Sequence, residues 1–389
     1  MARPCRIGVI ASHFIQYQAP IWRELAKREG MEVTVYYLSE HGKTPYYDPH
    51  FGQTFSWDIP LHEGYKWELL SGGEKSKLGS RRYRWSPWPV KKVCDGVADI
   101  FLRNEYDSPG AVAFFYACMA KGVPVLYRGE TTLLHENKST AVLKRAILKP
   151  VFKRIVFALA IGKLTREYAL SLGVPPGRII SSPYGVDTNY WETAARYWLP
   201  RRDDLRRLFG LPADRPIVLF CGKIFEKKRP LDLAQAMCQL AKRMPVSLLV
   251  AGTGDQMEKM KAITNSCGEL PVHFAGFVNQ SRLPEIYAAS DVLCLPSGGA
   301  ETWGLVVNEA MYFGCVPVVS DRVGCGPDLV DDIGEIHPVG DIEGIAASIM
   351  KVLDNLEVRR NSIPARIAQY SLTRAVDGIV EGAVRALNR

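Results

Sequence analysis

The stretch Glu301-Thr-Trp-Gly-Leu-Val-Val-Asn-Glu309 follows a short apolar run, Asp291–Pro296, and a loop with two adjacent glycines. The apolar run has the composition of a buried strand. Beyond the loop, the spacing of apolar side chains from about Leu305 to Phe313 suits an amphipathic helix that Gly314 stops. A strand that leads through a loop into a helix is the repeating unit of an α/β fold.

Two acids flank the start of this expected helix, where Gly304 stands. A helix start offers unpaired N–H groups and partial positive charge, and glycine lets the backbone approach an anion closely. The turn therefore predicts phosphate binding. Glu301 at the mouth of the helix and Glu309 inside it would then grip different parts of a phosphorylated sugar. The alternative is a surface-loop acid and an ordinary solvated glutamate.

A basic segment follows an earlier strand-like run, Ile217–Cys221. It places Lys223 and Lys228 beyond the carboxyl end of that strand, which is the edge at which open α/β sheets bind ligands. Lys227 and Arg229 stand beside them, so the cationic cluster is better defined than the individual lysines. The alternative is a set of solvated basic side chains.

Together these motifs resemble the donor site of the retaining GT-B glycosyltransferases of family 4, and the resemblance extends over nearly the whole chain. Members carry Gly-Arg/Lys, a lysine five residues later, a glycine-rich strand end, Glu-x-Phe/Trp-Gly and a second glutamate. This chain has all of them in that order, with Leu248–Asp255 as the glycine-rich strand end. Val272–Val278 resembles the family's strand and turn beside the nucleotide base.

The resemblance implies a role for each donor-site residue. Lys223 and Lys228 would stabilise the departing diphosphate. Glu301 would contact hydroxyls of the transferred sugar, and Glu309 would accept hydrogen bonds from the nucleotide ribose. The other donor-binding residues would be Gly222, Gly252, Phe277, Val278, Thr302, Trp303, Gly304 and Leu305.

The resemblance also implies transfer with retention of anomeric configuration, by front-face attack in which a leaving phosphate oxygen helps to deprotonate the acceptor. There the protein acts mainly by positioning and electrostatics. The chain has no Asp-x-Asp, the motif that commonly holds a metal in the other large glycosyltransferase fold, and no His-x-x-x-His. We therefore expect a metal-independent reaction with no cofactor besides the nucleotide-sugar co-substrate.

The acceptor side departs from the family pattern. Many members have a Gly-Gly loop after the first strand, whereas this chain has Ser12-His-Phe-Ile-Gln-Tyr-Gln-Ala-Pro20. His13, Gln16 and Gln18 in that loop would contact the donor or the acceptor, unless they only complete the loop.

Two further strand ends supply candidates. Arg128 and Glu130 follow a strand where other members place a histidine near the reacting carbon, and we expect these two residues to act in catalysis. Glu105 and Tyr106 end another strand at the same edge and would bind the acceptor.

Length and rhythm favour two domains. A chain of 389 residues is long for one domain, and strand-like and helix-like runs alternate in both halves, as in a doubly wound parallel sheet. We expect an α/β GT-B fold of two Rossmann-like domains facing a cleft: residues 1–195 for the acceptor and 196–364 for the nucleotide-sugar donor. The linker would lie near residues 190–200. Residues 365–389 have a helical pattern, and the family resemblance implies that this helix crosses back to pack on the first domain.

The composition favours a globular cytoplasmic protein. Hydrophobic residues make up 47% of the chain and charged residues 23%, so disorder is not indicated. We find no signal-peptide pattern and no run of 18 apolar residues. The nine cysteines are scattered with no Cys-x-x-Cys pair, which is typical of free thiols in a reducing compartment.

The net charge of +8 indicates an anionic partner. No nucleic-acid-binding signature occurs, which leaves an anionic substrate or an anionic membrane surface. Two segments bear on this choice. Lys75–Trp88 mixes cations and aromatic residues in a loop, and Leu143–Ile155 is a basic amphipathic segment around Pro150. The second could lie on the inner face of a membrane or pack its apolar face on the sheet, and both interpretations stay open.

The sequence as a whole predicts a retaining glycosyltransferase. It would move a sugar from a nucleoside diphosphate donor, with UDP favoured, to a glycan, a lipid-linked acceptor or a small molecule. Two alternatives are a non-hydrolysing sugar-nucleotide epimerase and a non-catalytic nucleotide-sugar binder. The paired lysines and paired glutamates match transferases and argue against both.

Overall fold

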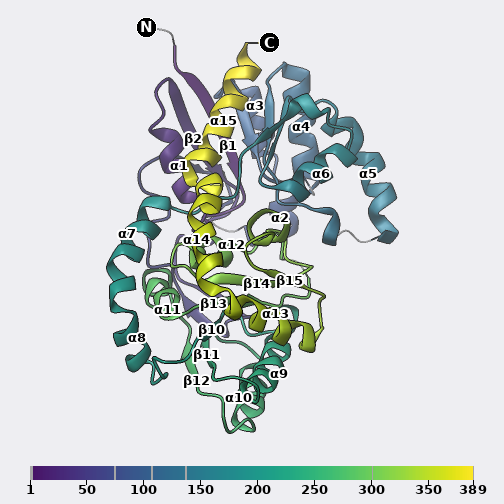
Figure 1. The fold of residues 1–389 in the computed structure, drawn as a ribbon. Coiled ribbons are helices and arrows are strands. Elements are labelled where there is room, and N and C mark those ends of the chain that lie inside the picture. Colours follow the sequence, from purple (N-terminus) through teal and green to yellow (C-terminus); the bar gives the residue numbers. More distant parts are fainter. Residues whose placement is uncertain (1–2, 74–75, 107, 136–137, 300, 389) are drawn as a thin grey trace. The chain divides into compact units, whose positions relative to one another are not determined.

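The computed structural model describes residues 3–73, 76–106, 108–135, 138–299 and 301–388 (Figure 1). Its residues divide into two compact units. Unit 1 comprises Met1–Tyr46, Ile59–Gly185 and Ser371–Arg389, and unit 2 comprises Tyr47–Asp58 and Val186–Tyr370.

Unit 1 is built on a seven-stranded parallel sheet with β1 near its middle. The short inner strands consist of buried residues, as expected for a sheet covered on both faces. In sheet order the strands are β5 (Lys66–Leu69), β2 (Met31–Tyr37), β1 (Cys5–Ala11), β6 (Ile100–Arg103), β7 (Val125–Tyr127), β8 (Phe157–Ala160) and β9 (Ile179–Ser181).

The helices of unit 1 follow the strands in the order of a doubly wound fold. The last of them, α15 (Leu372–Leu387), comes from the far end of the chain and packs against α1, β8 and β9 (Figure 1). The others are α1 (Ala19–Ala26), α2 (Arg81–Arg84), α3 (Trp88–Cys94), α4 (Pro109–Lys121), α5 (Lys138–Phe152) and α6 (Lys163–Ser171).

Unit 2 has a six-stranded parallel sheet. Its order is β12 (Val272–Gly276), β11 (Ser247–Ala251), β10 (Ile217–Cys221), β13 (Val292–Leu295), β14 (Val316–Ser320) and β15 (Glu335–His337). Its helices are α7 (Thr188–Trp198), α8 (Arg202–Leu208), α9 (Pro230–Ala241), α10 (Met257–Asn265), α11 (Leu283–Ala289), α12 (Leu305–Met311), α13 (Ile342–Asp354) and α14 (Leu356–Ile367). Two parallel sheets, each with its own helices, confirm the α/β class.

The segment expected to be the linker is helical. Residues 190–200 lie mostly in α7, which the Asp187 side chain caps by accepting a hydrogen bond from the Tyr190 N–H, 3.2 Å away. Trp191 and Ala195 are buried, so this helix belongs to the core of unit 2 despite its polar sequence. The two units divide between Gly185 and Val186 instead.

The long region after β2 also has more structure than a loop. Besides β5, α2 and α3, it contains a small hairpin of β3 (Tyr46–Asp48) and β4 (Gln53–Phe55). Residues Tyr47–Asp58, called the hairpin segment below, group with unit 2. Among the described residues, no helix is both long and apolar enough to cross a membrane.

Candidate functional site

The loop after β10 holds the two candidate lysines of unit 2. The five residues of β10 are buried, and the chain then leaves the sheet at Gly222 and turns through a short 3₁₀ helix, Glu226–Lys228. Arg229 adopts a left-handed conformation (φ 51°) and leads directly into α9. This tight turn fixes Lys223 and Lys228 at the carboxyl end of β10.

Lys228 reaches Glu301, which is 73 residues away in the sequence. The Lys228 ammonium donates a hydrogen bond to Glu301 Oε2, and the Ser297 hydroxyl donates to the same oxygen over 3.2 Å. The backbone holds the two loops together, because the Gly298 N–H donates to the Lys227 carbonyl at 2.7 Å. The predicted cationic and carboxylate parts of the site are therefore in direct contact.

The backbone after Glu301 is anchored on the chain that follows β14. The Gly324 N–H donates to the Glu301 carbonyl at 3.0 Å, and the Cys325 N–H donates to the Trp303 carbonyl at 2.9 Å. The Trp303 ring is buried, and its indole N–H donates to Asn308 Oδ1 at 2.7 Å. The buried Trp303 side chain thus stabilises the loop. Of this residue, the backbone is the part that can contact a ligand at the edge of the sheet.

Helix α12 begins directly after Gly304, as the sequence predicts. Gly304 has a φ of 96°, in the left-handed region that side chains disfavour, and an added Cβ would lie 3.1 Å from both Leu295 and Val323. The helix ends at Met311, two residues before the expected end at Phe313. Leu305 and Thr302 are partly buried at its start.

Glu309 is partly buried inside α12. Its carboxylate accepts hydrogen bonds from the Tyr287 hydroxyl at 2.7 Å and from the Gln280 side-chain amide at 3.1 Å. Loss of hydration raises the pKa of Glu309 to about 7, against the lowering effect of these two hydrogen bonds. A group with this pKa changes its hydrogen-bonding capacity near neutral pH.

The glycines after β10 and β11 permit two backbones to touch. A Cβ at Gly252 would lie 1.8 Å from the Gly222 carbonyl oxygen, and a Cβ at Gly254 would lie 2.2 Å from the Ile224 carbonyl oxygen. The Ile224 N–H donates to the Thr253 carbonyl at 2.8 Å. Gly252 therefore has a packing role in addition to the expected donor-binding role.

Lys223 has a partner that sequence reasoning missed. Its ammonium lies 2.8 Å from Asp48 Oδ2 in the hairpin segment and 4.9 Å from the centre of the Phe51 ring. The other oxygen of Asp48 accepts from the N–H groups of His50 and Phe51 at 2.9 and 3.1 Å. Burial raises the pKa of Asp48, but the bond to Lys223 and the two backbone bonds outweigh it and leave the pKa below its ordinary value.

The rest of the hairpin segment covers the expected base region. Phe277 contacts the rings of Phe51 and Phe55, with centroids 5.0 and 4.7 Å away. The Thr253 hydroxyl donates to the Phe51 carbonyl at 3.0 Å, and the Asn279 amide donates to the Ser56 carbonyl at 2.8 Å. Val278, beside Phe277, is partly buried.

In unit 1, the loop after β1 carries His13, Gln16 and Gln18. The His13 ring lies 5.2 Å from the His41 ring, and burial together with His41 lowers the pKa of His13 to about 3. Gln18 is 5% exposed, and its side-chain oxygen has no hydrogen-bond partner among the described residues. Gln16 is partly buried. A buried acceptor atom that is left unpaired is suited to a ligand donor group.

Arg128 and Glu130 both contact the chain after β9. The buried Arg128 guanidinium donates to Ser182 Oγ at 2.9 Å and to the carbonyls of Ser182 and Pro183 at 3.2 Å each. The Tyr184 hydroxyl donates to Glu130 Oε1. Burial lowers the pKa of Arg128. These contacts are typical of a side chain that joins two strand ends, and they occupy most of the Arg128 donors.

Glu105 and Tyr106 differ in their surroundings. Tyr106 is buried in the core, and its hydroxyl lies 2.6 Å from the Tyr168 hydroxyl and 3.1 Å from Thr131 Oγ1. Glu105 is partly buried and accepts a hydrogen bond from the Tyr83 hydroxyl at 2.5 Å. Of the two, Glu105 lies closer to solvent.

Possible metal ligands and cysteine thiols were sought among the described side chains. Within the described ranges, no three His, Cys, Asp or Glu side chains gather as they would to hold a metal ion. All nine cysteines are free thiols.

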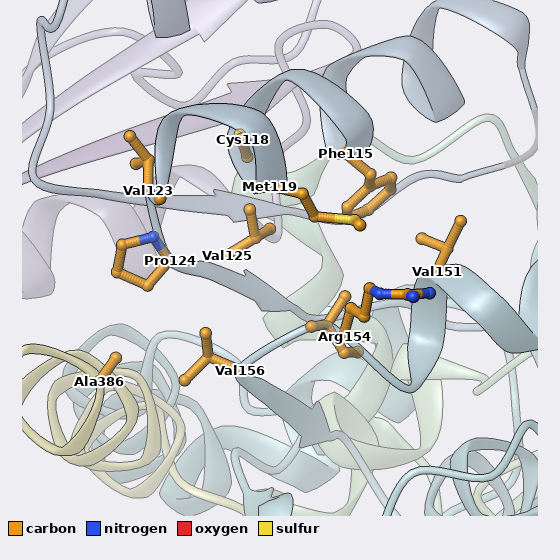
Figure 2. Close-up of a pocket in the computed structure, with 12 residues that line it drawn as sticks. Phe115, Cys118, Met119, Val123, Pro124, Val125, Val151, Arg154, Val156 and Ala386 are labelled. Atoms are coloured by element: carbon orange, nitrogen blue, oxygen red, sulfur yellow. The ribbon is translucent and has the colours of Figure 1, made fainter. Parts of the chain in front are cut away.

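The pocket in Figure 2 lies in unit 1, at the opposite edge of the sheet from these candidates. It has a volume of about 540 Å³ and lies beside Val125, the first residue of β7, whereas Arg128 follows the last residue of that strand. Apolar side chains such as Met119 and Val151 line it, with Arg154 beside them. It therefore takes no part in the candidate site.

Comparison with known proteins decides the enzyme class. Residues 201–368 match the family model described as Glycosyl transferases group 1. The protein is a glycosyltransferase of the GT-B type. This glycosyltransferase is 27% identical over 303 residues to the phosphatidyl-myo-inositol mannosyltransferase of Mycolicibacterium smegmatis. The matched region covers 75% of this chain and 73% of that protein. It is 32% identical over 197 residues to the D-inositol 3-phosphate glycosyltransferase of the same organism, over 48% of this chain and 44% of that protein.

Solved structures share the fold of the glycosyltransferase at low sequence identity. A glycosyltransferase from Rickettsia africae superposes with a TM-score of 0.72 at 13% identity, over 99% of both chains. HepE from Anabaena, in complex with UDP, gives a TM-score of 0.71 at 15% identity, over 97% of this chain and 98% of the other. These likenesses confirm the predicted GT-B fold.

Proposed function

We propose that this enzyme transfers a sugar, with retention of anomeric configuration, from a nucleoside diphosphate donor to a glycan, a lipid-linked acceptor or a small molecule. UDP is the favoured nucleotide. The observation that carries the proposal is the contact between Lys228 and Glu301, because it joins a phosphate-binding type of cation to a sugar-binding type of carboxylate.

Each residue then has a task at the carboxyl edge of the unit 2 sheet. Lys228 and Lys223 hold the diphosphate and stabilise the charge that develops as it leaves. Glu301 accepts hydrogen bonds from hydroxyls of the transferred sugar, and Glu309 accepts from the ribose. The acceptor hydroxyl attacks from the face that the diphosphate leaves, and a phosphate oxygen takes its proton. The two lysines supply the positive charge, so the proposed reaction needs no metal ion.

The names of related proteins support a proposal that includes several classes of acceptor. Two relatives are named for phosphatidyl-myo-inositol and for D-inositol 3-phosphate, and a third is the alpha-D-kanosaminyltransferase of Streptomyces kanamyceticus, 26% identical over 289 residues. The HepE structures with UDP and with UDP-glucose support the choice of nucleotide. A lipid-linked acceptor would bring this cytoplasmic enzyme to the inner face of a membrane.

Helix α5 is the proposed membrane contact. Leu148, Val151 and Phe152 are buried in unit 1, so part of its apolar face packs on the core, while Ile147 and Lys149 are exposed. Neutralising Lys149, Lys153 and Arg154 should abolish sedimentation with anionic vesicles. Equal partitioning of the variant and the wild type would exclude this contact.

Thermal-shift measurements with UDP, GDP, ADP and their sugars test the donor proposal. A ligand at 100 times its dissociation constant stabilises the folded protein by roughly 2.7 kcal/mol. We expect the UDP series to stabilise the wild type most, and to lose its effect in Lys228→Ala. An unfolding temperature that no nucleotide raises would contradict the donor proposal.

A further inference from the structure

A second pocket in unit 1 is lined in part by the basic and aromatic segment Lys75–Trp88, to which the proposed donor site assigns no role. It has a volume of about 480 Å³ and opens where β2 and β5 end, since Leu38 and Leu70 directly follow those strands. This is the carboxyl edge of the sheet, where α/β folds bind ligands. Glu74 and Lys75, at the start of the segment, lie outside the described residues.

Two arginines give the pocket its charge. Arg81 and Arg82 both line it, and both are exposed on the four-residue helix α2. The Arg82 guanidinium lies against Gly72, where an added Cβ would be 3.4 Å from Nε. Among the residues that the structure describes, neither arginine forms an ion pair with a carboxylate. Adjacent guanidinium groups without a carboxylate partner attract an anion strongly.

A buried hydroxyl points to a ligand independently of the charge. Ser76 also lines the pocket and is 6% exposed, yet its Oγ has no hydrogen-bond partner among the described residues. Its backbone is held in place, because the Ser39 hydroxyl donates to the Ser76 carbonyl at 2.5 Å. A buried hydroxyl without a partner costs free energy that a bound polar group would recover.

The aromatic lining adds a flat apolar surface. Trp85 is 64% exposed, which is unusual for so large a side chain, and Trp88 is partly buried beside it. A sugar ring presents C–H groups on one face and hydroxyls at its edge. A pocket lined by an indole ring and a hydroxyl suits such a sugar ring better than it suits a bare inorganic ion.

We propose that this pocket binds an acidic saccharide, in which Arg81 and Arg82 hold a phosphate or carboxylate group while Trp85 packs on the sugar ring and Ser76 bonds a hydroxyl. This assignment rests on the proposed function, since it names the class of acceptor, and the enzyme thus discriminates acidic from neutral acceptors. It also gives the excess of basic residues in the chain a substrate-binding purpose.

Equilibrium titrations of the full chain test the assignment, with glucose 6-phosphate, glucuronate, glucose and inorganic phosphate as probes. The wild type should bind both acidic sugars at least tenfold more tightly than glucose. Arg81→Gln/Arg82→Gln should remove that preference, and Trp85→Ala should weaken the acidic sugars without changing inorganic phosphate. Lys77→Gln is the matched control, because Lys77 is an exposed cation of the same segment that does not line the pocket.

Two results would overturn the assignment. One is an unchanged preference in the double arginine variant. The other is binding of phosphatidylglycerol vesicles through these arginines with no binding of the free acidic sugars, which would assign the pocket to a lipid headgroup. UDP binding, measured in the same proteins, reports on the proposed function separately. A wild type that binds acidic sugars but no nucleotide would refute the donor assignment and leave the pocket standing.

Discussion

The carboxyl edges of the two sheets use their charged residues differently. In unit 2, Lys228 and Glu301 pair with each other at the edge, and under the proposed function each of them contacts the nucleotide sugar. In unit 1, the buried Arg128 instead bonds the chain after β9. The same architecture thus pairs opposite charges on one edge, where we propose that the donor binds, and uses a buried charge for internal support on the other. Among the residues that the structure describes, Arg81 and Arg82 of α2 are exposed cations of unit 1 that form no ion pair with a carboxylate.

The largest expected effect comes from breaking the unit 2 pair. Lys228→Ala or Glu301→Ala should lower kcat by about 10²- to 10³-fold, because under the proposed function each removes a group that binds charge or hydroxyls in the transition state. Steady-state kinetics with a saturating donor measure this. Lys227→Ala is the control, since that exposed lysine contributes only its backbone carbonyl to the loop contact. Full activity in both variants would refute the site.

Arg128→Met tests the other side of the comparison. It should lower the free energy of unfolding by about 2–4 kcal/mol, because three buried acceptors at Ser182 and Pro183 lose their donor. Denaturant titration measures this loss. A fully stable but inactive protein would show instead that Arg128 acts in catalysis, as the sequence predicts.

Glu309 should make stability depend on pH. An acid whose folded pKa is about 7, against an ordinary value of 4.5, binds its proton more tightly in the folded state. The free energy of unfolding should therefore fall as pH rises from about 4.5 to 7, by roughly 2 kcal/mol after allowance for partial exposure, and then level off. Glu309→Gln, which stays neutral, should be more stable than the wild type at pH 8 and equal to it at pH 4.5. If the free energies of unfolding of the two proteins differed by the same amount at every pH, the raised pKa would be contradicted.

The smallest expected effect concerns Asp48. Its carboxylate neutralises Lys223, so Asp48→Asn should tighten UDP binding by roughly tenfold at low salt and by less at high salt. Calorimetry with UDP measures this, and uridine, which lacks phosphates, should bind both proteins equally. In a Lys223→Met background the Asp48 substitution should have no further effect. Weaker UDP binding in Asp48→Asn would mean that Asp48 orients the lysine for the donor.

The sequence predicted the features that local patterns of residues determine. Buried strands such as β10 and β13 are continuous apolar runs, and Gly304 marks the start of α12 because a left-handed residue there strongly favours glycine. That Lys228 and Glu301 share one edge of the sheet was predicted, because both lie beyond parallel strands and the motifs resemble a known family; their direct contact was not.

Other features depend on contacts that no local pattern records. Asp48 lies 175 residues from Lys223, and the short strands of its hairpin carry no long apolar alternation. The polar sequence of α7 concealed a helix because only Trp191 and Ala195 among its residues are buried. Strand β15 is three residues long with one buried residue, too short for a periodic signal.

The hairpin segment makes unit 2 discontinuous in sequence, because residues 47–58 join residues 186–370. A fragment that begins at residue 186 would lack the two rings that cover Phe277 and the carboxylate that neutralises Lys223. Recombination with a relative at a single junction near residue 186 would likewise pair one parent's hairpin segment with the other parent's loop after β10. Viable chimeras therefore require the hairpin segment to be inherited together with the domain it touches.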